Sequence, residues 1–122
     1  ASYYDAYLVA DGIIYPNTDA YCYFQDMKNL DILENLAGLD TSEVTDMSNM
    51  FYSMANSSTA LNFSITIRNP NVIDYSKMFA DFALEAGTQI TVNYTEETSH
   101  LVDSMIDTAN SDAHVVKGVQ VE

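Results

Sequence analysis

The chain has 122 residues, which is enough for one domain with a modest core and too few for two. Its 18 acidic and 4 basic side chains give a formal net charge of −14, which argues against nucleic acids and anionic membranes as partners. No apolar run approaches the roughly 20 residues of a membrane span.

The acidic residues are scattered along the chain rather than grouped. This distribution is typical of a solvated surface that keeps an extracellular or high-salt protein in solution. Binding of divalent cations is the alternative, although no loop has the spacing of a calcium-binding DxDxDG motif. Cys22 is the only cysteine, which excludes an internal disulfide, and its apolar neighbours favour a buried side chain over a nucleophile. We expect no metal site and no cofactor.

The N-terminal segment predicts a β-hairpin. In the stretch AYLVADGIIYP, Asp11 and Gly12 separate two short apolar runs, which is the strongest short hairpin signal. Pro16 and Asn17 end the second of these strands. We expect residues 1–17 to form a cap that covers the exposed end of the core that follows.

A repeat of about 27 residues follows the hairpin. The octet VTDMSNMF at 44–51 returns as VIDYSKMF at 72–79. Steps of about this length from Phe51 and Phe79 reach one equivalent position in each unit. We call these positions anchors, and they are Phe24, Phe51, Phe79 and Ile106. The columns four before, one before and three after the anchors are largely apolar, which is the spacing of one face of an α-helix. An aspartate stands five residues before three of the anchors, where it would cap a helix. The predicted helices lie near residues 20–28, 47–55, 75–85 and 100–109.

All six methionines fall in these columns. Their helical spacing and their recurrence favour packing in the core, because the flexible methionine side chain fills irregular gaps between stacked elements. A methionine-rich face that binds a ligand or copper is the alternative.

Between the helices the apolar period changes to two, which predicts one half-buried strand per unit. Two such strands alternate clearly, with Phe63, Ile65 and Ile67 in one and Ile90, Val92 and Tyr94 in the next. The first unit is less regular, and its expected strand contains Leu30, Ile32 and Leu33. The β-branched tail predicts a last strand through Lys117, Val119 and Val121. The prediction is a single α/β domain in which residues 18–122 form a solenoid of about four helix-strand units with parallel strands.

The string LDTSEVTDMSNMFYSM at 39–54 resembles the repeat of the BspA-like leucine-rich-repeat surface proteins, whose units have the form L-D-T-S-x-V-T-x-M-S-x-M-F. The match is close over 39–54, fair over 72–82 and weak in the flanking units. Tyr52 to Met54 replace the Gly-Cys that usually follows in the family, so the chain resembles a divergent, short member. The resemblance implies a leucine-rich-repeat-like fold in a secreted or cell-surface protein whose repeats serve adhesion and binding rather than catalysis.

No catalytic constellation is present in the sequence. The two histidines, His100 and His114, stand beside no candidate nucleophile, and no glycine-rich loop suits a phosphate. We therefore expect a protein without enzymatic activity.

The first functional hypothesis is adhesion to, or recognition of, a host or environmental protein or glycan. The predicted binding face is the outward row of two strands, Asn62, Ser64, Thr66, Arg68, Thr91, Asn93 and Thr95. Three N-x-S/T sequons, at Asn56, Asn62 and Asn93, are candidate glycosylation sites.

The second hypothesis is a self-assembling subunit of an extracellular filament or surface layer, which stacks end to end with further copies of itself. It rests on the tail HVVKGVQVE, which lacks an obvious capping helix, and on a tyrosine-rich start. The candidate residues for self-association are Tyr3, Tyr4, Tyr7 and Tyr15. Packing of these rings between the hairpin cap and the first repeat is the alternative.

Overall fold

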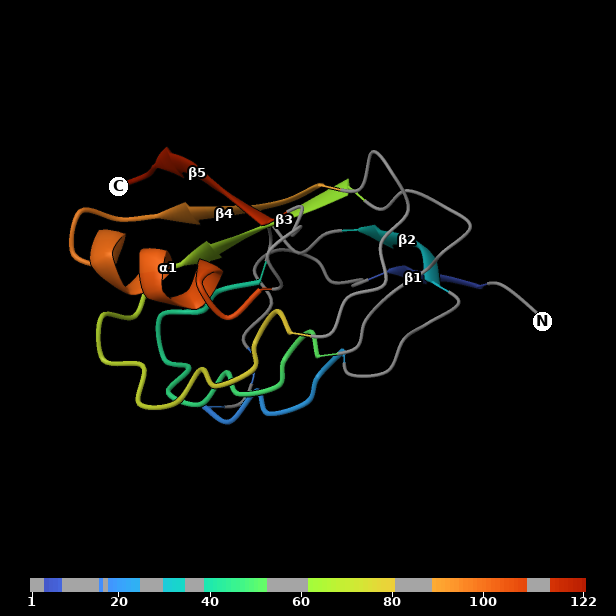
Figure 1. Ribbon diagram of the computed structural model, residues 1–122, viewed down its shortest axis with the longest axis horizontal. Helices are drawn as coiled ribbons and strands as arrows, with labels where there is room; N and C mark the ends of the chain where they lie inside the picture. The colour runs from blue at the N-terminus through green and yellow to red at the C-terminus, as the bar shows by residue number, and fades with distance from the viewer. Residues whose placement is uncertain are drawn as a thin grey trace.

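The computed structural model describes residues 4–7, 16, 18–24, 30–34, 39–52, 62–80, 89–109 and 115–122. In chain order the elements are β1 (Tyr4–Tyr7), β2 (Leu30–Glu34), β3 (Asn62–Ile67), β4 (Gln89–Tyr94), α1 (Ser99–Ile106) and β5 (Val115–Gln120). The sheet strands lie on one side of the molecule and a set of irregular turns on the other (Figure 1).

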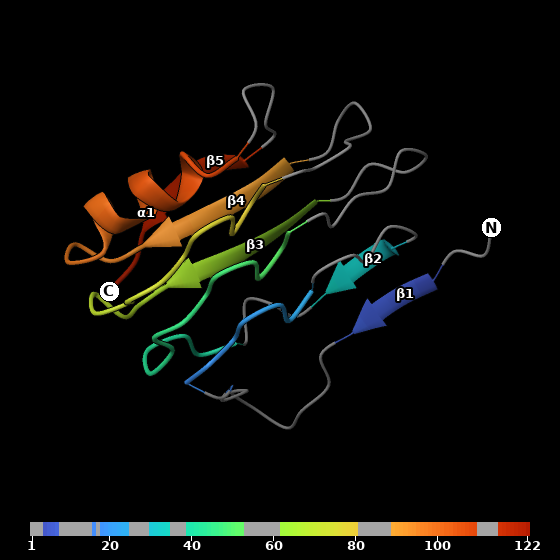
Figure 2. The same cartoon turned by 60° about the horizontal axis from the view of Figure 1, so that its bottom comes forward.

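All strand pairs in this part of the chain are parallel. One sheet has the order β3-β4-β5, and β1 pairs with β2. Figure 2 shows the arrows of β1 to β4 side by side in chain order, with β5 beyond β4. The β3–β4 register is unbroken from Asn62 opposite Gln89 to Ile67 opposite Tyr94.

On the other side lie three turn segments, residues 18–24, 45–51 and 73–79, which we call the turn ladder. Parallel bridges join three aspartates, Asp19, Asp46 and Asp74. Backbone N–H groups of 18–24 donate to carbonyl oxygens of 45–51 at 2.8 to 3.2 Å, and 45–51 donates to 73–79 in the same way. Within each segment one i→i+3 hydrogen bond closes a turn, as from Met50 N–H to Met47 O at 3.2 Å, while the other backbone bonds run between segments.

A tight turn opens each segment of the ladder. Asp46 Oδ1 accepts hydrogen bonds from the Ser48 backbone N–H at 2.9 Å and from the Ser48 hydroxyl at 2.6 Å. Asp74 and Ser76 form the same pair, at 2.9 and 2.8 Å. The third residue after each aspartate has a positive φ, which is 62° at Cys22, 55° at Asn49 and 56° at Lys77. A left-handed residue at this position prevents a right-handed helix from continuing.

The predicted helices near 20–28, 47–55 and 75–85 are therefore wrong where the structure describes them. The aspartates do accept backbone N–H groups, as the predicted caps would, but they close turns of the Asx type. In the described residues only the fourth predicted helix forms, as α1. The predicted leucine-rich-repeat-like solenoid of four helix-strand units is accordingly replaced, in the described residues, by a three-stranded parallel sheet with one helix, a β1–β2 pair and the turn ladder.

The core lies between the sheet and the turn ladder. Phe51 stacks between Phe24 and Phe79, with ring centroids 5.4 Å apart in both pairs and interplanar angles of 7° and 2°. Phe63 of β3 packs against Phe51 from the sheet side, with ring centroids 5.5 Å apart. Three of the four anchors of the sequence repeat thus form an aromatic stack in the core.

Four methionines lie in this core with exposed fractions of 0 to 1%, namely Met47, Met50, Met78 and Met105. The prediction that methionine packs in the core is confirmed for these residues, while Met27 and Met54 lie outside the described residues. The apolar columns therefore predicted these buried residues correctly, although only the last unit carries them on a helix.

The predicted strands are confirmed for β2, β3 and β4. β5 forms in the predicted tail, but it contains one extra residue between the positions opposite Val92 and Tyr94. This bulge turns Val119 outward, where it is 65% exposed, although the repeat had placed it on the inner side.

The predicted hairpin of residues 1–17 centres on Asp11 and Gly12, which lie outside the described residues. What is described of this segment is β1 and Pro16, and β1 runs parallel to β2.

Buried polar side chains tie the strand ends to the turns, a feature that the apolar pattern did not predict. The Thr41 hydroxyl donates to Thr66 O at 2.7 Å and accepts the Arg68 N–H at 2.9 Å. The Thr98 hydroxyl donates to Ile67 O at 2.8 Å, and the Asn69 side-chain amide donates to a backbone carbonyl at 2.9 Å. Within the described residues no buried side-chain polar atom lacks a hydrogen-bond partner, as expected of a stable core.

Candidate binding face

The outward sides of β3, β4 and β5 form one continuous surface, which we call the outward face. Along β3 and β4 buried residues alternate with half-buried or exposed ones, because side chains on a strand point to opposite sides in turn. The parallel register places Ser64 beside Thr91 and Thr66 beside Asn93. The structure thus brings these four predicted residues together.

The three other residues of the predicted row lie at the two ends of the outward face. Asn62 is exposed at the start of β3. Arg68 and Thr95 follow the ends of β3 and β4, and Arg68 is exposed while Thr95 is half-buried.

Two residues of the row are held by the fold itself. The Asn93 side-chain oxygen accepts the backbone N–H of Val119 at 2.9 Å, so this amide fills the bulge of β5. The backbone N–H of Thr95 donates to the Thr98 hydroxyl at 2.8 Å. We therefore assign Asn93 and Thr95 a structural role in addition to their place on the outward face.

β5 extends the outward face beyond the predicted row. Val116 lies opposite Thr91 in the register and is 40% exposed, and Val119 is 65% exposed. Sequence reasoning missed Val119 because the repeat was extended into β5 without a bulge, and it missed Val116 because the predicted row covered only the first two of these strands. The signal that could have found the bulge is Gly118, since glycine inside a strand often marks one.

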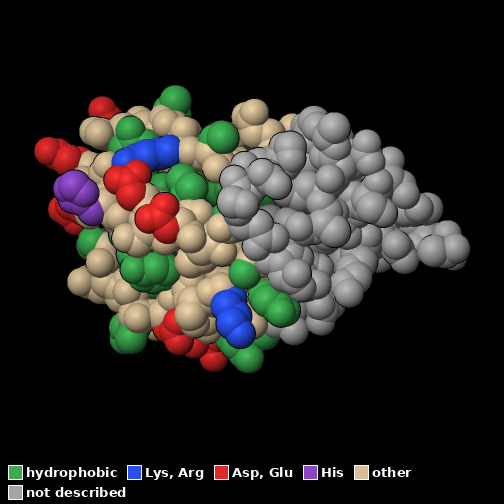
Figure 3. Space-filling model, viewed as in Figure 1, with side chains coloured by type: hydrophobic (Ala, Val, Ile, Leu, Met, Phe, Trp, Pro, Cys, Tyr) green, Lys and Arg blue, Asp and Glu red, His purple; other side chains and the backbone are tan. Residues whose placement is uncertain are grey.

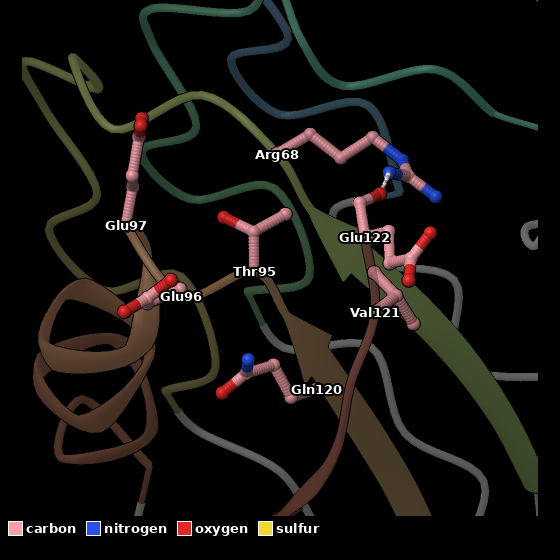
Figure 4. Close-up of a pocket in the computed structure, with 7 residues that line it drawn as sticks. All are labelled: Arg68, Thr95, Glu96, Glu97, Gln120, Val121 and Glu122. Carbon is pink, nitrogen blue, oxygen red and sulfur yellow. Dashed lines mark hydrogen bonds between the residues drawn. The ribbon is translucent and has the colours of Figure 1, made fainter.

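An open hollow of about 400 Å³ lies where β3, β4 and β5 end. Its lining residues are Arg68, Thr95, Glu96, Glu97, Gln120, Val121 and Glu122. Figure 4 shows Glu96 and Glu97 on the α1 side of the hollow, and Arg68 and Glu122 on the other side. The Arg68 guanidinium donates to the backbone oxygen of Glu122 at 2.7 Å, which closes one wall.

Arg68 also acts on the carboxylate of Asp40. Hydrogen bonds from the Ser42 hydroxyl and the Ser42 backbone hold the pKa of Asp40 below its usual value, and the positive charge of Arg68 lowers it further. The charge of Arg68 is thus partly balanced within the protein.

Acidic residues are absent from the three strands that form the outward face. β3, β4 and β5 have the sequences NFSITI, QITVNY and VVKGVQ, although the chain has 18 acidic residues. Figure 3 shows acidic side chains elsewhere, over the α1 end of the molecule and along its lower edge in that view. The outward face is therefore a neutral surface in a strongly acidic protein.

The remaining candidate residues lie away from this face or outside the described chain. Tyr4 and Tyr7 are the first and last residues of β1, and Tyr3 and Tyr15 lie outside the described residues. Of the three candidate glycosylation sites, Asn62 is exposed, Asn93 is half-buried and Asn56 is not described.

Within the described ranges no three His, Cys, Asp or Glu side chains are placed to hold a metal ion. No helix there has the length and apolar character needed to cross a membrane. Comparison of the chain with protein-family models, with curated proteins and with solved structures found no match. The geometry of the outward face is therefore the main guide to function.

Proposed function

We propose that this protein is a non-enzymatic extracellular or cell-surface module that recognises a protein or glycan through the outward face. The observation that carries the proposal is the absence of acidic residues from β3, β4 and β5 in a chain of net charge −14. A partner that covers this face desolvates no carboxylate, so it avoids one of the main costs of binding.

The side chains of the outward face suit a neutral polar partner. Ser64, Thr66 and Thr91 present hydroxyl groups, which both donate and accept hydrogen bonds. Val116 and Val119 add exposed apolar area beside them. This mixture of apolar area and two-way hydrogen bonding fits an uncharged glycan or a neutral protein surface.

The extracellular location is part of the proposal and rests on sequence features. The string at 39–54 resembles the repeat of BspA-like surface proteins, in which repeats serve binding. The exposed position of Asn62 is compatible with a glycan at that sequon.

Two substitutions test the outward face. Ser64→Glu and Thr91→Glu each place one carboxylate at its centre, where a partner would have to desolvate the charge. We expect each to weaken binding about tenfold or more, which corresponds to about 1.4 kcal/mol. The probes are a glycan array and a panel of immobilised extracellular-matrix proteins, and circular dichroism verifies folding. The matched control is His100→Glu, which adds the same charge at an exposed position in the first turn of α1.

Retention of binding by both folded variants at the level of the control would contradict the proposal. Loss of binding in the control as well would show that net charge matters more than the outward face, which also contradicts it.

End-to-end assembly into a homopolymer is the second candidate, and the exposed valines of β5 favour it. Negative-stain electron microscopy of the native protein separates the two, because only the second candidate produces filaments.

A further inference from the structure

We propose that α1 and β5 form a stop that prevents a second copy of this chain from adding a strand beside β5. Among the described residues β5 pairs with β4 alone, so it is an edge strand of the sheet. Edge strands expose backbone groups that can pair with another chain, and proteins protect them with bulges, inward charges or covering elements. This inference goes beyond the proposed function and concerns the end of the sheet instead of its outward face.

The first part of the stop is the bulge. A methyl group on Gly118 would overlap Asn93 Oδ1 and lie 2.6 Å from Thr91 Cγ2, so any larger residue would displace these side chains. The same oxygen accepts the N–H of Val119, in the place of a backbone carbonyl of a regular ladder. The outer edge of β5 is irregular as a result, and a straight strand cannot match it along its whole length.

The second part is Lys117, whose side chain lies on the inner side of β5. Its Nζ donates to Asp103 Oδ1 at 2.9 Å and to Ser99 Oγ at 2.8 Å, and lies 4.6 Å from the centre of the Tyr94 ring. The Lys117 side chain is 29% exposed and that of Asp103 is 55% exposed. A strand added beside β5 would cover this ion pair, and removing water from paired charges costs free energy that the pair does not fully return.

The third part is α1, which takes the place that a fourth turn segment would have. The last segment of the turn ladder is connected to the residues after α1 by a hydrogen bond to a side chain. The Phe79 backbone N–H donates to the Thr108 hydroxyl at 3.0 Å. The buried side of α1 carries Val102 and Met105, while His100, Asp103 and Ser104 are exposed. A second copy would therefore meet a polar helix surface and not an open turn with unpaired backbone groups. The helix predicted near 100–109 thus covers the tail, which the sequence analysis had taken to lack a capping helix.

The test removes the protection of the β5 edge in two steps, and we call the variant that carries both changes the opened variant. Lys117→Met keeps an unbranched side chain that is one atom shorter and removes its charge. The second variant adds deletion of Gly118, which restores a regular register from Val92 to Tyr94. We expect the wild-type protein to stay monomeric in sedimentation velocity as its concentration rises. The opened variant is expected to increase its average mass about twofold or more, as head-to-tail contacts that do not close form.

A third substitution shows whether the association uses the edge. Val119 and Val121 direct their N–H groups toward β4, so the N–H of Gln120 between them points outward. Gln120→Pro removes this donor and is compatible with an edge strand. In the opened variant it should restore the monomer.

A folded opened variant that stays monomeric would overturn the proposal. So would a wild-type protein that associates and is dissociated by Gln120→Pro. If circular dichroism shows that the deletion prevents folding, the decision rests on Lys117→Met alone, and an unchanged monomer then contradicts the proposal. Binding of ligand by the outward face does not enter these measurements, so the two proposals fail separately.

Discussion

The turn ladder and α1 occupy equivalent places in the sequence repeat but have different backbones. Both place apolar residues at the anchor, one before it and four before it. In the ladder these residues stand on turns that bond to their neighbours, whereas in α1 they stand on a helix of eight residues. The same apolar spacing is thus compatible with both backbones.

The polar residues determine whether a unit forms a turn or a helix. Asp46 and Asp74 are each followed two positions later by a serine that donates to the carboxylate, and then by a left-handed residue. In α1 the position equivalent to the aspartate is Leu101, so this turn cannot form and the helix continues through Ile106. The comparison teaches that an aspartate before an apolar stripe predicts a helix cap only when the next residues permit a helix.

The largest expected effect is a difference in stability between two substitutions, one at an anchor of the turn ladder and one at the anchor of α1. Phe51→Ala removes the central ring of the stack, which is fully buried, and we expect a loss of about 3 to 5 kcal/mol in the free energy of unfolding. Ile106 is the anchor of α1 and is only half-buried, so Ile106→Ala should cost about 1 kcal/mol. Urea denaturation measures both. Equal losses would show that the aromatic stack is not the main support of the ladder.

The next effect concerns the turn that distinguishes the ladder from α1. Asp46→Ala leaves the backbone N–H and hydroxyl of Ser48 without their acceptor, and Ser48 is only 5% exposed. We expect a loss of about 1 to 3 kcal/mol, because buried donors without partners keep their desolvation cost. Asp19→Ala is the control, since Asp19 is exposed and accepts the Tyr21 backbone N–H, so its loss should be smaller. The result would contradict this account if the two changes cost the same.

The apolar period predicted which residues are buried and which strands form, because burial imposes a period of two on strands and a fixed set of columns on each unit. It could not predict the backbone of the ladder. That backbone depends on the hydrogen bond between Ser48 and Asp46 and on backbone hydrogen bonds between segments that are far apart in the sequence. The outward row could be predicted from β3 and β4, which pair without interruption. Its extension by Val119 could not, because the bulge arises from contact between Asn93 and Gly118.

A smaller effect depends on pH. Backbone and hydroxyl hydrogen bonds from Ser76 lower the pKa of Asp74 below its usual value. Because the folded pKa is the lower one, the carboxylate stabilises the fold fully above the unfolded pKa, and this stabilisation is lost as pH falls through the folded pKa. Asp74→Asn should therefore remove part of the loss of stability seen below about pH 4. Thermal unfolding of both proteins between neutral and acidic pH measures this, and parallel curves would exclude a role for Asp74.

The smallest effect is a gain, and it tests the left-handed residue that ends each turn of the ladder. Asn49 and Lys77 have nearly the same φ, 55° and 56°, and asparagine adopts this conformation at lower cost than lysine. Lys77→Asn should relieve about 1 kcal/mol of this cost. It also removes the contact of Lys77 Nζ with the Tyr52 ring at 5.9 Å, which contributes about 0.5 kcal/mol at an exposed site.

The net expectation for Lys77→Asn is stabilisation by about 0.5 kcal/mol, which urea denaturation can detect. Lys77→Gln is the matched control, because it removes the contact with Tyr52 without easing the left-handed backbone, and it should destabilise by about 0.5 kcal/mol. If both variants lose stability equally, the backbone at Lys77 carries no cost. The positive φ would then not be the feature that separates the ladder from α1, and the bonds between segments would have to account for the difference alone.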